Sequence, residues 1–94
     1  MYGLIVKLTI VPGKREEMVR ILKESAINMR GCISYVVAKD LTDENVLWVT
    51  EVWDSAASHN SSVALPSVKK AVPHAKEIVS AFEKVATTEP IWEA

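Results

Sequence analysis

The stretch from Gly31 to Trp53, GCISYVVAKDLTDENVLWVTEVW, decides the fold. Two runs rich in β-branched and aromatic residues, 31–38 and 46–53, flank a polar break at 41–45, which is the pattern of a β-hairpin. Apolar side chains occupy both alternating sets of each run, whereas a sheet with one face in water alternates apolar and polar residues. We therefore expect the chain's helices to cover one face of the sheet and a second copy of the chain to cover the other.

Periodic segments on either side of the hairpin complete one α+β domain over residues 1–94. We expect a strand over 2–11, a helix over 14–29, a short helix over 55–63, a longer helix whose apolar stripe runs from Val68 to Phe82, and a strand over 84–92. Pro73 should bend the longer helix or divide it in two. The order β-α-β-β-α-β is that of the ferredoxin-like split βαβ fold, with a four-stranded antiparallel sheet and the helices on one face.

Composition excludes several classes of function. The net charge is −1 and no basic stripe is present, so we expect no nucleic-acid partner. No apolar segment approaches the length of a membrane span, and the N-terminal run has no signal-peptide pattern. The single cysteine, Cys32, fits a reducing compartment. Together these features predict a cytoplasmic protein.

Several short motifs occur in a fixed order along nearly the whole chain. They are Pro12-Gly13-Lys14, Gly31-Cys32-Ile33-Ser34-Tyr35, Thr50-Glu51-Val52-Trp53-Asp54-Ser55, Ala57-Ser58-His59, Ser62, and Leu65-Pro66-x-Val68. In this order and spacing the chain resembles the antibiotic biosynthesis monooxygenase superfamily, which includes quinol-monooxygenase-like proteins. The resemblance implies a dimeric α+β barrel with a cavity between sheet and helices in each subunit.

The resemblance also implies a choice of chemistries. Some members oxygenate phenols or quinols with dioxygen and use neither metal nor flavin, others degrade haem, and others isomerise or bind small metabolites. The haem-degrading branch carries an asparagine on the first strand and a tryptophan on a helix. This chain has neither at the corresponding positions, which argues against haem degradation.

His59 is the candidate catalytic residue, because a histidine titrates near neutral pH and can take a proton from a phenol. It follows the end of a strand, where sites are common, although it can equally be a packing residue in a short helix. Asn60 is a candidate for holding a carbonyl or hydroxyl group; its alternative is a local Asx-type hydrogen bond.

Tyr35, Trp48 and Trp53 are candidate substrate-binding residues of the hairpin. An aromatic wall suits a flat apolar molecule, and a tyrosine hydroxyl can orient it. Packing in the core or at the dimer interface is the alternative for each tryptophan. The register between the two strands is not fixed by the sequence.

His74 lies at the edge of the apolar stripe of the longer helix, from which it can reach the same cavity as His59. Two histidines without a carboxylate partner make a poor metal site, and we expect Glu51 to pair with Lys7 or Lys39 instead, so no metal is predicted. Neither a G-x-G-x-x-G nor a P-loop motif is present, and we expect no cofactor.

Two functions follow from these residues. The first is a cofactor-independent monooxygenase that oxidises a small aromatic phenol or quinol with dioxygen. The second is a non-catalytic small-molecule binder on the same homodimeric scaffold. A dimer with a mainly structural role and a closed cavity is a third possibility.

Overall fold

The computed structural model describes all 94 residues. Its elements follow in the order β1 (Tyr2–Ile10), α1 (Arg15–Ser25), β2 (Cys32–Lys39), β3 (Val46–Trp53), α2 (Ala56–Ser62), α3 (Pro66–Ile78) and β4 (Val79–Thr88). The predicted β-α-β-β-α-β order is confirmed, with α2 and α3 following β3. None of the helices combines the length and apolar character needed to cross a membrane.

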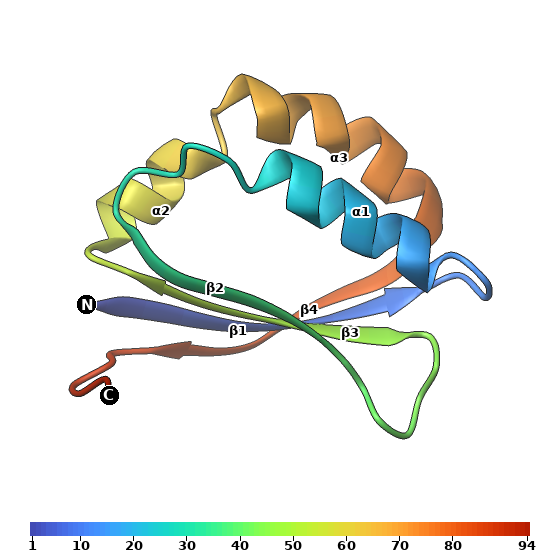
Figure 1. The fold of residues 1–94 in the computed structure, drawn as a ribbon, viewed down its shortest axis with the longest axis horizontal. Coiled ribbons are helices and arrows are strands. Elements are labelled where there is room, and N and C mark those ends of the chain that lie inside the picture. The colour runs from blue at the N-terminus through green and yellow to red at the C-terminus, as the bar shows by residue number, and fades with distance from the viewer.

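The four strands form one antiparallel sheet in the order β2-β3-β1-β4. All three helices lie on the same side of this sheet, and the opposite side carries no other element (Figure 1). The two chain termini and α2 lie at one end of the molecule, and the β2–β3 turn lies at the other. The predicted ferredoxin-like architecture is therefore confirmed.

Three element boundaries differ by several residues from those predicted. One is the C-terminal end of β4, which lies at Thr88 rather than at residue 92. Helix α1 ends at Ser25 rather than near residue 29, and Asn28 with φ 52° lies in the left-handed region that helices do not use. Helix α3 ends at Ile78 and β4 begins at Val79, with no residue between them. Phe82, predicted as the end of the helical stripe, therefore lies on a strand. Pro73 lies inside α3 without dividing it.

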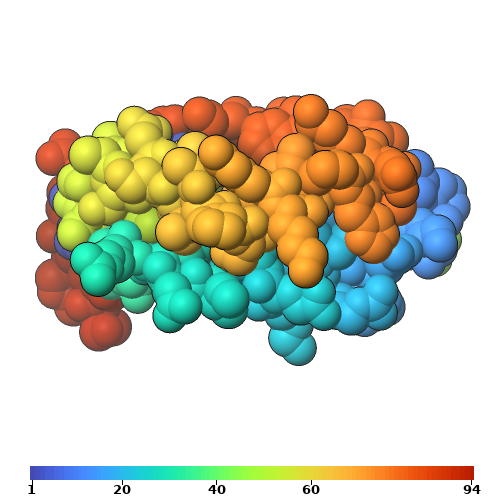
Figure 2. All heavy atoms as spheres, turned by 90° about the horizontal axis from the view of Figure 1, so that it is seen from above, coloured from blue at the N-terminus to red at the C-terminus, as the bar shows by residue number.

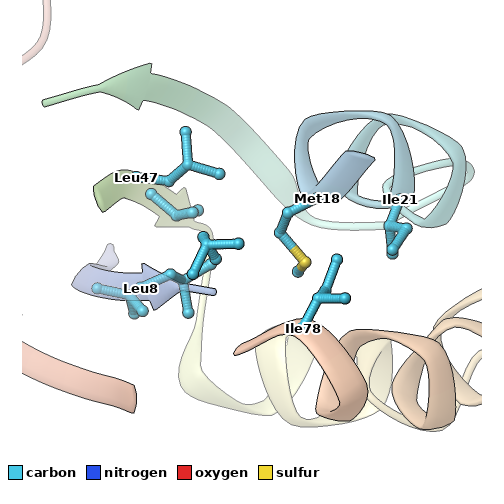
Figure 3. Close-up of a cluster of buried hydrophobic side chains, with 8 residues drawn as sticks. Leu8, Met18, Ile21, Leu47 and Ile78 are labelled. Carbon is cyan, nitrogen blue, oxygen red and sulfur yellow. The ribbon is translucent and has the colours of Figure 1, made fainter. Parts of the chain in front are cut away.

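The core lies between the sheet and the helices. Its buried cluster takes alternate residues of β1 and β3 together with one face of α1 and the end of α3: Val6, Leu8, Ile10, Met18, Ile21, Leu47, Val49 and Ile78. Figure 3 shows Met18 of α1 directed toward Leu8 of β1 and Ile78 of α3. The period of two in the strands and the helical period of α1 thus meet in one apolar layer.

The opposite face of the sheet is uncovered and partly apolar. The register places Ile5 beside Thr50 and Lys7 beside Trp48, and Val36 lies across from Thr50 on the other side. Val36 is 51% exposed. A partly apolar uncovered sheet face agrees with the hairpin pattern that led us to expect a second copy of the chain.

Candidate functional site

A cavity of about 660 Å³ lies between the sheet and the helices, beside the core. It is apolar, because 17 of its 24 lining residues are hydrophobic. Leu4 and Val6 of β1 form part of its floor, and Leu22 of α1 and Ala71 of α3 contribute on the helix side. Its size and character match sites for small, mostly apolar ligands.

The cavity has an open side between α3 and β4. Val72 of α3 and Phe82 of β4 both line it and are 40% and 66% exposed. Figure 2 shows the red-orange atoms of β4 along the edge of the molecule beyond the orange atoms of α3. The cavity therefore reaches the surface along this edge.

Local hydrogen bonds position His59 on α2. Ser55 caps the helix by accepting a hydrogen bond from the Ser58 backbone N–H at 3.2 Å. The backbone of Gly31, with φ 82°, accepts a hydrogen bond from the Asp54 N–H at 2.8 Å, and a Cβ at Gly31 would lie 2.5 Å from Ser58 Oγ. This close approach, which only glycine allows, holds α2 against the start of β2.

The His59 ring lines the cavity and packs between two aromatic side chains. Its centroid lies 5.7 Å from that of Tyr2 and 5.4 Å from that of Trp53, the latter in an edge-to-face arrangement. The Nδ1 atom is buried and has no hydrogen-bond partner. Nε2 is therefore the ring nitrogen that a ligand can reach. Because an unsatisfied buried donor is rarer than an unsatisfied buried acceptor, the arrangement favours a proton on Nε2.

Glu51 is the polar cavity residue that sequence reasoning missed. It does not pair with Lys7 or Lys39: Lys7 lies over the Trp48 ring on the uncovered face, and Lys39 pairs with Glu16. Glu51 instead lines the cavity and accepts a hydrogen bond from Trp53 Nε1 at 3.0 Å.

The signal for Glu51 was its phase on the third strand. Glu51 lies on the same face of the strand as Leu47, Val49 and Trp53, and all three of these side chains are buried. A carboxylate in an otherwise buried set is costly unless it is paired or used. Trp53 contacts both Glu51 and His59, so a carboxylate and an imidazole lie at the same end of the cavity.

Tyr35 lines this end of the cavity, as predicted for a substrate-binding residue, and lies directly opposite Glu51 in the β2–β3 ladder. Burial raises the pKa of the Tyr35 hydroxyl, and the negative charge of Glu51 raises it further. The side chain therefore remains a neutral phenol at physiological pH. It is available as a hydrogen-bond donor to a ligand.

Four predicted binding residues do not line the cavity. Trp53 is completely buried beside it, where its ring packs against His59 and its Nε1 donates a hydrogen bond to Glu51. The other three lie farther away. Trp48 is on the uncovered face, where its Nε1 donates to Asp40 Oδ1 at 2.8 Å. His74 does not reach the cavity: its Nε2 lies 2.9 Å from Glu17 Oε1 at the surface, and this hydrogen bond lowers the pKa of Glu17. Asn60 is exposed and does not line the cavity, because it follows His59 on the outer side of α2.

Metal-ligating side chains do not gather at this site. No group of three or more histidine, cysteine, aspartate or glutamate side chains lies in an arrangement suited to a metal ion. The titratable groups at this end of the cavity are the Glu51 carboxylate, the His59 imidazole and the Tyr35 phenol, and Ser62 lines the cavity one helical turn after His59. These groups can accept a proton, donate hydrogen bonds and orient a hydroxylated ligand.

Solved structures with the same fold are numerous. A protein from Chloroflexus aurantiacus J-10-fl, named after the antibiotic biosynthesis monooxygenases, is 43% identical with a TM-score of 0.94, covering 99% of this chain and 95% of that one. Proteins with the same family name from Deinococcus radiodurans and Nitrosomonas europaea share the fold at 21% and 11% identity. The Deinococcus match has a TM-score of 0.83 and covers 100% of this chain and 96% of that one. The Nitrosomonas match has a TM-score of 0.87 and covers 98% of this chain and 100% of that one.

No curated protein matches the chain. The sequence profile of the antibiotic biosynthesis monooxygenase family matches residues 1–74, which include the first three strands, α1, α2 and most of α3. The matched residues include Tyr35, Glu51 and His59. By this match and by the 43% identity over nearly its full length, the chain belongs to the antibiotic biosynthesis monooxygenase family.

Proposed function

We propose that the protein is a cofactor-independent monooxygenase that oxidises a small aromatic phenol or quinol with dioxygen, as a cytoplasmic homodimer. The observation that carries this proposal is the apolar cavity with a carboxylate and an imidazole at one end. Family membership supports a monooxygenase-type scaffold. For a hydroquinone, the reaction consumes one dioxygen and yields a hydroxyquinone and one water.

The reaction begins with loss of the substrate's hydroxyl proton. Glu51 accepts this proton, since it brings a negative charge into an apolar cavity and Trp53 engages only one of its oxygens. His59 donates a hydrogen bond from Nε2 to the resulting oxyanion, and Tyr35 donates a second. His59 as the proton acceptor, the role predicted from the sequence, is the alternative assignment.

The deprotonated ring is electron-rich and reacts with dioxygen at a ring carbon. Electron transfer from the anion to dioxygen, followed by recombination, forms a carbon–oxygen bond and gives a peroxide anion on the ring. Glu51 returns its proton to this anion, which gives a hydroperoxide. Loss of water from this hydroperoxide cleaves the O–O bond and leaves the hydroxyquinone. The apolar walls contribute by orienting the ring and limiting the access of water.

Oxygen uptake with a panel of hydroquinones tests the proposal. Glu51→Gln should lower kcat/KM by about 100-fold or more, and His59→Ala by about 10- to 100-fold. His74→Ala is the matched control, because that histidine is paired with Glu17 at the surface. No uptake by the wild type, or equal uptake by all variants, removes the proposal. A larger loss in His59→Ala than in Glu51→Gln reverses the two roles.

A non-catalytic binder of small aromatic molecules is the second candidate. The open side between α3 and β4 favours it, because an oxygenation site benefits from the exclusion of water. A thermal-shift screen under air separates the two functions. A hydroquinone that raises the Tm and is recovered unchanged supports the binder, whereas conversion to a product containing one oxygen atom from isotopically labelled dioxygen supports the enzyme.

A further inference from the structure

Two lysines line the apolar cavity at its open side. Lys76 is in the last turn of α3, and Lys84 lies on β4 opposite Val6 of β1, whose side chain is in the core. Neither lysine makes a salt bridge, whereas Lys14 and Lys39 each pair with a glutamate. The chain therefore brings two unpaired positive charges to the rim of a cavity that is otherwise apolar.

The neighbouring carboxylates do not neutralise this pair. Glu83 precedes Lys84 on β4, but it lies opposite Lys7 and so belongs to the uncovered face of the sheet. Glu77 follows Lys76 on α3 and does not line the cavity. The carboxylate that does line the cavity, Glu51, accepts a hydrogen bond from Trp53 and forms no salt bridge with either lysine.

The register also fixes how far Lys84 lies from the polar end of the cavity. Glu51 on β3 is opposite Leu4 of β1, and Lys84 on β4 is opposite Val6 of the same strand. Two strand spacings and two residue steps thus separate Glu51 from Lys84, which places their Cα atoms roughly 12 Å apart. The floor between them is formed by Leu4 and Val6.

We propose that the cavity takes an amphiphilic aromatic anion, with its flat apolar body over Leu4 and Val6 and its carboxylate or sulfonate held by Lys76 and Lys84. This proposal rests on the proposed function, since it describes the substrate class of the same cavity. A hydroxyl at the opposite end of such a molecule lies near Glu51 and His59. The anionic group stays at the open side, where water still solvates it, so its transfer into the cavity carries little desolvation cost.

Two fluorescent probes with nearly the same apolar body test the proposal. Anilinonaphthalene sulfonate carries a negative charge, and N-phenyl-naphthylamine does not. In the Lys76→Gln/Lys84→Gln variant, the ratio of the neutral probe's Kd to the anionic probe's Kd should fall about tenfold relative to the wild type. The Lys69→Gln/Lys70→Gln variant is the control. It also removes two positive charges, but from exposed positions of α3 that do not line the cavity.

Methionine methyl NMR locates the bound probe. Met18 and Met29 line the cavity and Met1 does not, so the first two signals should shift on titration and the third should not. An unchanged Kd ratio in the double variant overturns the proposal. A response of Met18 and Met29 to the neutral probe alone also overturns it, but leaves the cavity available for an uncharged quinol. Because the binding assay involves no turnover, failure of oxygen uptake is a separate result.

Discussion

Trp48 and Trp53 lie five residues apart on β3 and project to opposite faces of the sheet. Trp53 is completely buried beside His59, whereas Trp48 lies on the uncovered face beside Lys7. Both were predicted as cavity-wall residues. Their separation by an odd number of positions placed them on different faces of the strand. The difference shows that the two faces of this sheet are unlike: the face toward the helices borders the cavity, and the other face is uncovered and partly apolar.

The largest expected effect is the loss of stability when the buried tryptophan is replaced. Trp53→Ala should lower the free energy of unfolding by about 3–5 kcal/mol, because it leaves a large cavity and removes the hydrogen bond to Glu51. Trp48→Ala should cost about 1 kcal/mol, since its ring is already partly exposed. Urea unfolding of both variants at a matched oligomeric state measures the difference. Equal losses would contradict the assignment of the two faces.

The next effect concerns the uncovered face. Val36→Lys should raise the dissociation constant of the proposed homodimer about 100-fold, because it places a charge in the apolar part of that face. Ile27→Lys is the matched control: Ile27 is also 51% exposed but lies between α1 and β2. Sedimentation over a range of concentrations measures both. A wild type that stays monomeric at micromolar concentration would sink the proposed dimer.

A smaller effect is the pH dependence of the Trp48 contact. The hydrogen bond from Trp48 Nε1 lowers the pKa of Asp40 from 3.8 to about 2, helped by the backbone N–H groups of Asp43 and Thr42. A pKa depressed in the folded state adds stability above the unfolded value and loses it as the pH falls from about 4 to about 2. The wild type should therefore lose more Tm across this range than Asp40→Asn, as differential scanning calorimetry would show. Parallel curves would mean that the contact is not formed.

The smallest effect tests the contact between Lys7 and Trp48. The Lys7 Nζ atom lies 5.9 Å from the Trp48 ring centroid. Lys7→Gln should lower the free energy of unfolding by about 0.5 kcal/mol, the size of an exposed cation–π interaction. In a Trp48→Leu background the same substitution should have almost no effect, so a double-mutant cycle measures the interaction. A coupling energy near zero would show that Lys7 contributes only charge to this face.

The sequence predicted the fold well because the fold depends on local periodicity. Alternation in β1 and the hairpin, and the helical stripe of α1, led directly to the β-α-β-β-α-β order. The α3–β4 boundary was misplaced because Val79 and Phe82 satisfy the helical spacing as well as the strand pattern. Over so short a run of β-branched and apolar residues, the two periods are hard to tell apart.

The site was only partly predictable, because it depends on how strands pair. His59 and Tyr35 line the cavity as expected. His74 instead forms a hydrogen bond with Glu17 of α1, a residue 57 positions away in the sequence. Glu51 was assigned to a salt bridge because the face of β3 that meets the helices was not known. Once that face is fixed, a single carboxylate among Leu47, Val49 and Trp53 stands out.

The direct junction between Ile78 and Val79 has a consequence for where β4 can change in length. Between Val79 and Ala81, β4 carries one residue more than the strand β1 that it pairs with, so the loss of one residue there can be absorbed while Lys84 stays opposite Val6. From Ala81 to Lys84 the two strands pair residue for residue, so a change of one position within this run would move Lys84 to the opposite side of the sheet. Chain length from Ala81 to Lys84 is therefore a simple marker for sorting homologues by the charge at the rim of the cavity.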